Sequence, residues 1–218
     1  MKKYLEVLAE AKKYGARLIV VSKLQAIDKI KSLYDLGCRD FAENRVQDLL
    51  ERKAALPEDI RWHLIGHLQT NKVKSIVTFI YLVQSVDSVA LLKVIDTQAS
   101  KADKFVDVLL EVKIASEQTK FGFSKEELFT FLESADYKKF HNVRICGLMG
   151  MATFTEDAKI IRSEFKLLKS IFEEVKRMHI FPDDQFVDLS IGMSSDYTIA
   201  LEEGSSMLRV GTLVFSDL

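Results

Sequence analysis

Eight short apolar runs separated by stretches of helical periodicity constrain the fold of this chain more than any other feature. The runs lie at residues 18–21, 40–42, 62–65, 79–83, 106–112, 144–148, 186–189 and 208–210. Amphipathic segments separate most of them, at residues 27–36, 46–55, 89–100, 125–134, 157–178 and 195–203. This alternation predicts parallel strands joined by helical crossovers. Eight such units in 218 residues favour an α/β fold of the (β/α)8 TIM-barrel type over a doubly wound sheet, which more often has about five to seven strands.

The composition predicts one domain without a strong overall electrostatic field. A hydrophobic content of 48% can form one sizeable core, so we expect a single barrel domain over residues 1–218, with the amphipathic stretch 4–14 covering an end or flank. The net charge of −1 gives no general attraction to nucleic acid or to a membrane surface. Cys38 and Cys146 stand far apart, and no apolar segment resembles a signal peptide or a membrane span. We therefore expect a cytoplasmic protein.

Small and polar residues gather where the predicted strands end. Barrel enzymes place their chemistry on the loops that follow the C-terminal ends of the strands. We therefore expect one functional rim made of residues that follow the runs: Lys23, Glu43, Asn44, Arg45, Gly66, His67, Gln69, Asn71, Thr119, Lys120, Gly122, Met149, Met151, the segment 192–196, Gly211 and Thr212.

Lys23 closes the first apolar run. A lysine that is partly desolvated at a strand end has an accessible neutral amine, which can form a Schiff base. The alternative is a lysine whose aliphatic stem lies on apolar surface while its ammonium reaches water. From this residue alone the second interpretation is favoured.

Two turns of small and hydroxyl-bearing residues follow the last two strands. The first contains Gly192, Ser194 and Ser195, and the second contains Gly211 and Thr212. In a barrel these loops are the usual phosphate site, where backbone N–H groups bind an anion. Helix capping by a serine and a tight glycine turn would explain each turn alone. The coincidence of two such turns favours phosphate.

Arg209 ends an otherwise apolar strand and therefore needs a fixed acceptor. One candidate acceptor is the ring nitrogen of a heteroaromatic cofactor, which an arginine keeps unprotonated because its own proton is held too tightly. The other is an ion pair with Glu43 or Asp196. This residue alone does not separate the two.

Other chemistry-bearing residues carry weaker signals. His63 and His67 have metal-like spacing but no shared helix face, so we interpret His63 as a core histidine. The segment 69–72 is typical of a helix entry with polar caps. Met149, Met151 and Met193 could line a flat ligand or fill the core.

A strand-end amine, an anion site and a strand-end arginine on one rim match the aldehyde, phosphate and ring nitrogen of pyridoxal 5′-phosphate (PLP). Five segments in order, at residues 20–23, 40–47, 62–72, 189–196 and 208–212, resemble the PLP homeostasis proteins of the YggS/PROSC type. The barrel of that family is similar to the N-terminal domain of alanine racemase. The resemblance covers nearly the whole chain.

The resemblance implies a cofactor site and a role. It implies that PLP is held as an internal aldimine, and that the protein is a carrier or regulator in vitamin B6 and amino-acid balance without an established reaction. Partners are then PLP and, as candidates, apo forms of PLP-dependent enzymes. The chain ends soon after the eighth run, so we expect no second β domain of the racemase kind and a monomer. By motif matching the cofactor-binding residues are Lys23 at the aldehyde, Ser194, Gly211 and Thr212 at the phosphate, Arg209 at the ring nitrogen, Asn44 beside the cofactor and Met193 against it.

Two alternatives stay open. A low-activity amino-acid racemase would need a second proton carrier on the opposite face of the substrate, and none is evident. A barrel that binds another phosphorylated metabolite would use Lys23 as a counter-charge. The chain also departs from the family pattern at Ala42, Phe121 and Ser216, which affects the expected shape of the entrance rather than the cofactor contacts.

Overall fold

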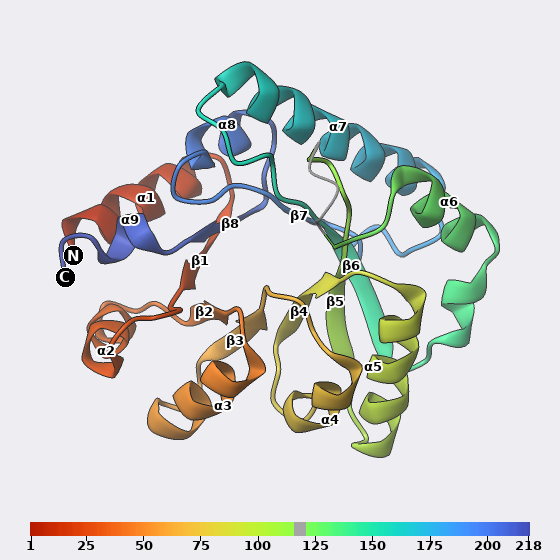
Figure 1. Cartoon of the computed structure of the whole chain (residues 1–218), viewed down its shortest axis with the longest axis horizontal. Coiled ribbons are helices and arrows are strands. Elements are labelled where there is room, and N and C mark those ends of the chain that lie inside the picture. The colour runs from red at the N-terminus through yellow and green to blue at the C-terminus, as the bar shows by residue number, and fades with distance from the viewer. Residues whose placement is uncertain (116–120) are drawn as a thin grey trace.

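The computed structural model describes residues 1–115 and 121–218, which form a closed parallel barrel (Figure 1). Each strand pairs with the next along the chain, and β8 pairs with β1. Thr119 and Lys120, expected on the functional rim, lie outside the described residues. The predicted (β/α)8 TIM barrel is confirmed. Its strands are β1 (Arg17–Val21), β2 (Asp40–Glu43), β3 (Arg61–Leu64), β4 (Leu82–Val86), β5 (Val106–Glu111), β6 (Val143–Met149), β7 (Asp188–Ser190) and β8 (Met207–Val210).

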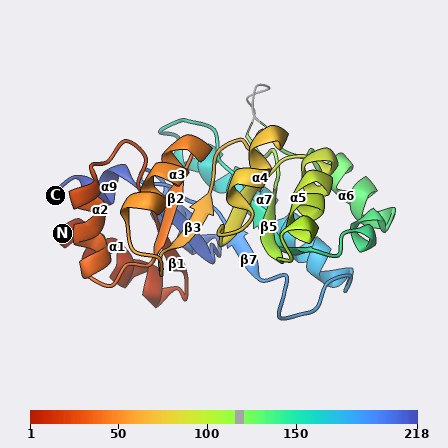
Figure 2. The same ribbon diagram turned by 90° about the horizontal axis from the view of Figure 1, so that it is seen from below.

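Helices surround the strands. Figure 1 shows α3, α4 and α5 along one side of the barrel and α7 and α8 along the other. The first helix of the chain packs on the flank of the barrel beside the last helix. The Met1 ammonium lies 2.7 Å from the Asp217 carboxylate, so the N-terminus and the C-terminus lie side by side (Figure 2). The helices are α1 (Lys2–Lys13), α2 (Ile27–Asp35), α3 (Val46–Ala55), α4 (Val73–Ile76), α5 (Val89–Lys101), α6 (Lys125–Glu133), α7 (Ala158–Arg177), α8 (Tyr197–Glu202) and α9 (Thr212–Phe215), with 3₁₀ turns at Thr70–Lys72 and Asp136–Lys139.

The fourth strand begins later than its apolar run predicts. The run at 79–83 starts inside a helical turn, because the backbone N–H groups of Phe79 and Ile80 donate to the carbonyl of Ile76 at 3.1 and 2.9 Å. The strand instead continues through Gln84 and Ser85, which are polar yet fully buried. A search for apolar residues misses such a strand because its polar side chains are satisfied only in the folded barrel.

Strand residues alternate between two apolar clusters. Leu18 and Val20 belong to the larger cluster that joins the sheet to the helices, whereas Ile19 and Val21 belong to a small cluster inside the barrel. Both faces of β1 are therefore buried, which explains its continuous apolar run. The interior cluster consists of Ile19, Val21, Ala42, Leu82, Leu109, Met149 and Met207. Within the described residues, no helix is long and apolar enough to cross a membrane.

Candidate functional site

The C-terminal ends of the strands open into a cavity of about 750 Å³. This volume lies within the range of about 300–1,000 Å³ that is typical of small-molecule sites. All seven residues that we expected to bind a cofactor line this one cavity: Lys23, Asn44, Met193, Ser194, Arg209, Gly211 and Thr212. The barrel thus brings together residues from four strand-to-helix loops and from β8.

Lys23 lies in the turn that follows β1, and its side chain is exposed rather than desolvated. The turn itself is held firmly. The Gln25 N–H donates to the carbonyl of Ser22 at 3.1 Å, and Leu24 adopts a left-handed conformation with φ of 63°. The Ser22 hydroxyl donates to Glu43 at 2.6 Å. The backbone of Lys23 is therefore fixed at the cavity edge while its amine is accessible.

Glu43 is buried behind that turn and faces α3 instead of the cavity. Its carboxyl accepts the Ser22 hydrogen bond and lies 3.7 Å from the Arg52 guanidinium, and its Oε2 atom has no hydrogen-bond partner in the part of the chain that the structure describes. Burial raises the pKa of Glu43, although the contacts with Ser22 and Arg52 oppose the shift. Glu43 therefore stabilises the turn that carries Lys23 through its hydrogen bond with Ser22.

Arg209 is almost fully buried at the floor of the cavity. Its Nη1 donates to the Ser190 hydroxyl at 2.6 Å, and its Nη2 donates to the carbonyl of Gly150 at 3.0 Å. The expected alternative of an ion pair with Glu43 or Asp196 is wrong, because no carboxylate of a described residue lies within ion-pair distance of this guanidinium. Burial lowers the pKa of Arg209 to about 10, so the guanidinium is still charged at neutral pH.

The two turns after β7 and β8 are tied together. The Ser194 hydroxyl accepts a hydrogen bond from the backbone N–H of Leu213 at 3.3 Å, and α8 has no side-chain cap, so the alternative of helix capping by a serine is wrong. Gly192 has φ of +96°, and a Cβ there would lie 2.5 Å from the Cβ of Ala200. A Cβ on Gly211 would lie 2.7 Å from the carbonyl oxygen of Val21. Both glycines are required by close approach of neighbouring chain segments.

Asp196 closes the first of these turns from beneath. Its Oδ1 accepts from the backbone N–H of Met193 at 2.5 Å, and it is buried. Burial raises the pKa of Asp196, while the hydrogen bond from Met193 and the charge of Arg209 oppose that shift. The Asp196 carboxyl therefore fixes the backbone conformation of the turn whose residues Met193 and Ser194 line the cavity.

Three cavity residues, Ile65, Glu111 and Phe154, had no role in our sequence expectations. His67, which was expected on the rim, stacks on Phe121 at the cavity edge with ring centroids 4.0 Å apart. Phe154 is 91% exposed, so an apolar ring faces solvent at the mouth of the cavity. Ser190 and the Gly150 carbonyl, which hold Arg209, were also missed because nothing local in the sequence links them to a strand-end arginine.

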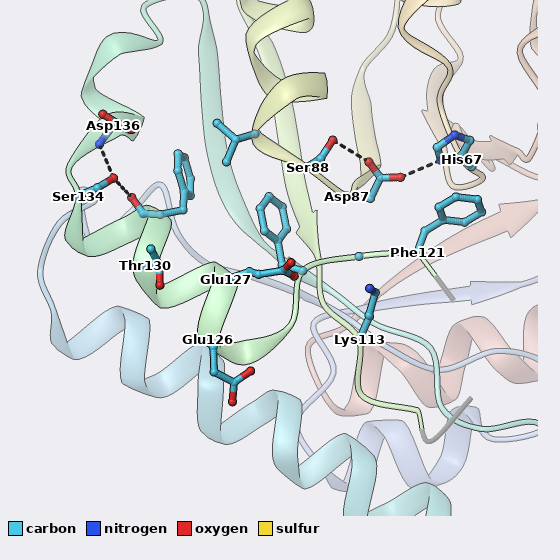
Figure 3. A pocket seen from close by; sticks show the side chains of 14 residues that line it. His67, Asp87, Ser88, Lys113, Phe121, Glu126, Glu127, Thr130, Ser134 and Asp136 are labelled. Carbon is cyan, nitrogen blue, oxygen red and sulfur yellow. Dashed lines mark hydrogen bonds and ion pairs between the residues drawn. The ribbon is translucent and has the colours of Figure 1, made fainter. Parts of the chain in front are cut away.

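A larger groove of about 980 Å³ lies beside this cavity, between the loops after β4 and β5 and helix α6 (Figure 3). It shares His67 and Phe121 with the central cavity. In Figure 3 Asp87 lies between Ser88 and His67, and its carboxylate is 2.7 Å from the His67 Nδ1. Asp87 is thus engaged with His67, and Glu127 accepts a hydrogen bond from the backbone N–H of Ser124 at 2.8 Å.

The remaining sequence signals have structural explanations. His63 is fully buried and contacts Asp40 at 3.2 Å and Gln84 at 3.1 Å, as expected of a core histidine. The segment 69–72 does enter a helix, since the 3₁₀ turn at Thr70–Lys72 leads into α4, but neither element has a side-chain cap, so the expected polar caps are wrong. Among residues 1–115 and 121–218 no three His, Cys, Asp or Glu side chains cluster as a metal site requires. Burial raises the pKa of the Cys38 and Cys146 thiols to about 12.

The groups on the cavity wall match a flat phosphorylated carbonyl compound in their chemistry. Lys23 supplies an amine, Arg209 a charged donor, Ser194 and Thr212 hydroxyls, and Met193 an apolar surface. The close approach at Gly211 leaves no room for a side chain between β8 and β1, so the backbone itself borders the cavity. These residues fit the three polar groups of PLP.

Fold and cavity together define a class of protein: a parallel (β/α)8 barrel whose C-terminal mouth combines a lysine amine, a buried guanidinium and linked small-residue turns. The family profile of the alanine racemase N-terminal domain matches residues 1–218. The chain is 35% identical to the pyridoxal phosphate homeostasis protein of Synechocystis sp., covering 98% of this chain and 96% of that protein. The human protein of that name is 33% identical, covering 92% and 76%. The chain belongs to the pyridoxal phosphate homeostasis protein family, which confirms the resemblance found in the sequence.

Solved structures agree with this assignment. PipY of Synechococcus elongatus PCC7942, without PLP, superimposes with a TM-score of 0.87 at 32% identity, covering 96% of this chain and 98% of PipY. The PLP-bound form of PipY gives a TM-score of 0.84 at 31% identity with the same coverage. Alanine racemase of Clostridium difficile has a TM-score of 0.77 at 13% identity, covering 98% of this chain and 55% of that one, and thus shares the fold.

Proposed function

We propose that residues 1–218 form a single PLP-binding barrel domain that holds the cofactor reversibly as a Schiff base on Lys23 and acts in intracellular PLP (vitamin B6) homeostasis and amino-acid balance. One observation carries this proposal: an accessible lysine amine, a buried charged arginine and two linked turns line the same cavity. The names of the relatives and the PLP-bound structure of PipY support it.

Each cavity residue has a defined part in this proposal. PLP supplies an aldehyde that condenses with an amine with loss of water. Lys23 is the amine, since its turn is fixed while its side chain reaches the cavity. Ser194 and Thr212 with the backbone of Gly211 hold the phosphate. Asn44 and Met193 lie against the ring.

Arg209 is proposed to donate a hydrogen bond to the ring nitrogen. Its pKa of about 10 keeps the guanidinium protonated at neutral pH, so the ring nitrogen that it faces stays unprotonated. An unprotonated pyridine is a weaker electron sink than a pyridinium. This weaker electron sink supports a non-catalytic carrier over a low-activity racemase. The carrier that we propose is a cytoplasmic monomer and passes PLP to apo forms of PLP-dependent enzymes.

The cofactor assignment is tested by covalent trapping. The wild-type protein mixed with PLP should develop a visible Schiff-base band, and borohydride reduction followed by peptide mapping should place the adduct on Lys23. Lys23→Ala should lose the band, whereas Lys31→Ala, which removes an exposed lysine of α2, should keep it. An adduct scattered over surface lysines, or an unchanged band in Lys23→Ala, would refute the proposal.

The carrier and racemase roles are separated by proton exchange. A racemase removes the α-proton of an amino acid, so in deuterium oxide it introduces deuterium at that carbon. We expect no deuterium in supplied L- or D-amino acids incubated with the PLP-loaded protein at rates above those of free PLP. Faster incorporation that disappears in Lys23→Ala would establish the racemase alternative.

A further inference from the structure

A column of buried polar side chains runs through the barrel interior from its N-terminal end to Arg209. Asp40 begins β2, His63 and Gln84 lie on the neighbouring strands β3 and β4, and Ser190 ends β7. Consecutive members are joined by contacts of 3.2 Å between Asp40 and His63, 3.1 Å between His63 and Gln84, 2.7 Å between Gln84 and Ser190 and 2.6 Å between Ser190 and Arg209. His63, Gln84 and Ser190 have no solvent exposure. The column connects the far rim of the barrel to the floor of the cavity.

The chemistry of its two ends fixes the direction of every hydrogen bond. Hydrogen bonds from Arg61 and His63 outweigh the effect of burial and hold the pKa of Asp40 at about 2, so its carboxylate only accepts. His63 must then carry its proton on Nε2, which leaves Nδ1 to accept from the Gln84 amide. The Gln84 oxygen accepts from the Ser190 hydroxyl, and the Ser190 oxygen accepts from the Arg209 Nη1.

All donors in the column therefore point away from the cavity and toward Asp40. The bidentate contact with Arg61 at the rim, at 2.8 and 2.5 Å, anchors that carboxylate. A serine has only one proton, so the Ser190 hydroxyl accepts from Arg209 without conflict only while Gln84 presents its oxygen. Gln84 in turn presents its oxygen to Ser190 only while His63 Nδ1 is an acceptor. Buried chains of this kind polarise one another and leave few alternative arrangements.

We propose that Asp40, His63, Gln84 and Ser190 are positioning residues that aim the Arg209 guanidinium at the ring nitrogen of the bound ligand, so that a carboxylate at the opposite end of the barrel contributes to ligand affinity. This inference rests on the proposed PLP site for its ligand, but the donor direction is a property of the protein alone. None of the four side chains lines the cavity. They act only through Arg209.

The first test measures PLP affinity and the absorption spectrum of bound PLP in matched variants. Ser190→Ala should weaken PLP binding about tenfold and shift the band, because the ring nitrogen loses an oriented donor. Ser205→Ala is the matched control: Ser205 is also buried, but its hydroxyl donates only to the backbone carbonyls of Ile191 and Met207. We expect its affinity to stay within about twofold of wild type.

The second test addresses the remote end. Asp40→Asn should weaken PLP binding about threefold, since it removes the charge on which the column ends. Asp188→Asn changes the same chemical group at the same rim, where Asp188 pairs with Arg17 at 2.6 Å, and within residues 1–115 and 121–218 Asp188 makes no side-chain hydrogen bond to a member of the column. Equal losses in both variants, or no loss in Asp40→Asn, would overturn the remote contribution.

A readout on the cofactor-free protein keeps the inference separate from the proposed function. Nitrogen-15 NMR should show His63 as the Nε2-protonated neutral tautomer, identified by the loss of its signals in His63→Gln. Slow hydrogen exchange of the Arg209 guanidinium should become faster in Ser190→Ala and stay slow in Ser205→Ala. The Nδ1-protonated tautomer, or unchanged exchange, would overturn the network even if PLP binds. Failure of the wild type to bind PLP would refute the proposed function while these measurements still decide the network.

Discussion

Ser194 and Leu213 join two loops that are close in space, since the Ser194 hydroxyl accepts the backbone N–H of Leu213 at 3.3 Å. One loop follows β7 and the other begins α9 after β8. The two turns that we propose to hold phosphate therefore form a single unit. We therefore expect a substitution in one turn to change the conformation of the other.

Ser194→Ala tests that unit. Removal of the hydroxyl deletes both the link to Leu213 and a proposed phosphate contact, so we expect PLP binding about tenfold weaker and an unfolding free energy lower by about 1 kcal/mol. The measurements are PLP titration and urea unfolding. Ser216→Ala is the control, because the exposed Ser216 hydroxyl donates to the Leu213 carbonyl at 2.8 Å outside the cavity. Unchanged PLP affinity in Ser194→Ala would contradict the phosphate assignment.

Gly192→Ala and Gly37→Ala separate backbone strain from steric clash. The two glycines have similar φ values of +96° and +92°, so each alanine costs about 1–2 kcal/mol of backbone energy. A Cβ at Gly37 meets nothing within 4 Å, whereas at Gly192 it lies 2.8 Å from Leu208 Cδ2 and closer still to Ala200. Urea unfolding should show an additional loss of about 1–3 kcal/mol in Gly192→Ala. Equal losses in the two variants would mean that the β7 loop has room to move.

Glu43→Gln should change how stability depends on pH. Burial raises the pKa of Glu43 in the folded protein, so the folded state holds a proton that the unfolded state releases above about pH 4.3. The Glu43 carboxyl therefore contributes stability to the wild type at low pH. This contribution is lost as the pH rises through the raised pKa that Glu43 has in the folded protein. We expect the unfolding free energy of wild type to fall relative to that of Glu43→Gln from about pH 4 to pH 7. Parallel stability curves would show that Glu43 ionises normally.

Asp40→Asn should have the opposite pH dependence. The folded pKa of about 2 lies below the unfolded value of about 3.9, so the carboxylate contributes stability above pH 4 that is lost as pH falls toward 2. Urea unfolding should show a loss of about 2–3 kcal/mol at pH 7 that shrinks steadily below pH 4. A loss that is the same at pH 3 and pH 7 would assign it to packing instead of charge.

Much of the site could be predicted because its residues occupy positions that the chain marks locally. Lys23, Gly211 and Thr212 each lie within two residues of the end of a short apolar run, and strand ends in a parallel barrel converge on one rim. Lys23 was nonetheless ambiguous in the sequence, and only the barrel places it in one cavity with Arg209 and Ser194. The ion pair that the sequence left open for Arg209 is wrong, because the partners of its guanidinium, Ser190 and the Gly150 carbonyl, are neutral and distant in sequence.

The sequence by itself determined the architecture. Apolar runs and helical periodicity are local properties, and eight units in alternation favour the closed parallel barrel over a doubly wound sheet, which also buries both faces but more often has fewer strands. Only the tertiary structure decided which polar side chains share the barrel interior. Gln84 sits in a strand that an apolar search misplaced, and its role depends on His63 and Ser190 from other strands. Hydrogen-bond partners across a closed barrel are set by strand register and stagger, which no local pattern encodes.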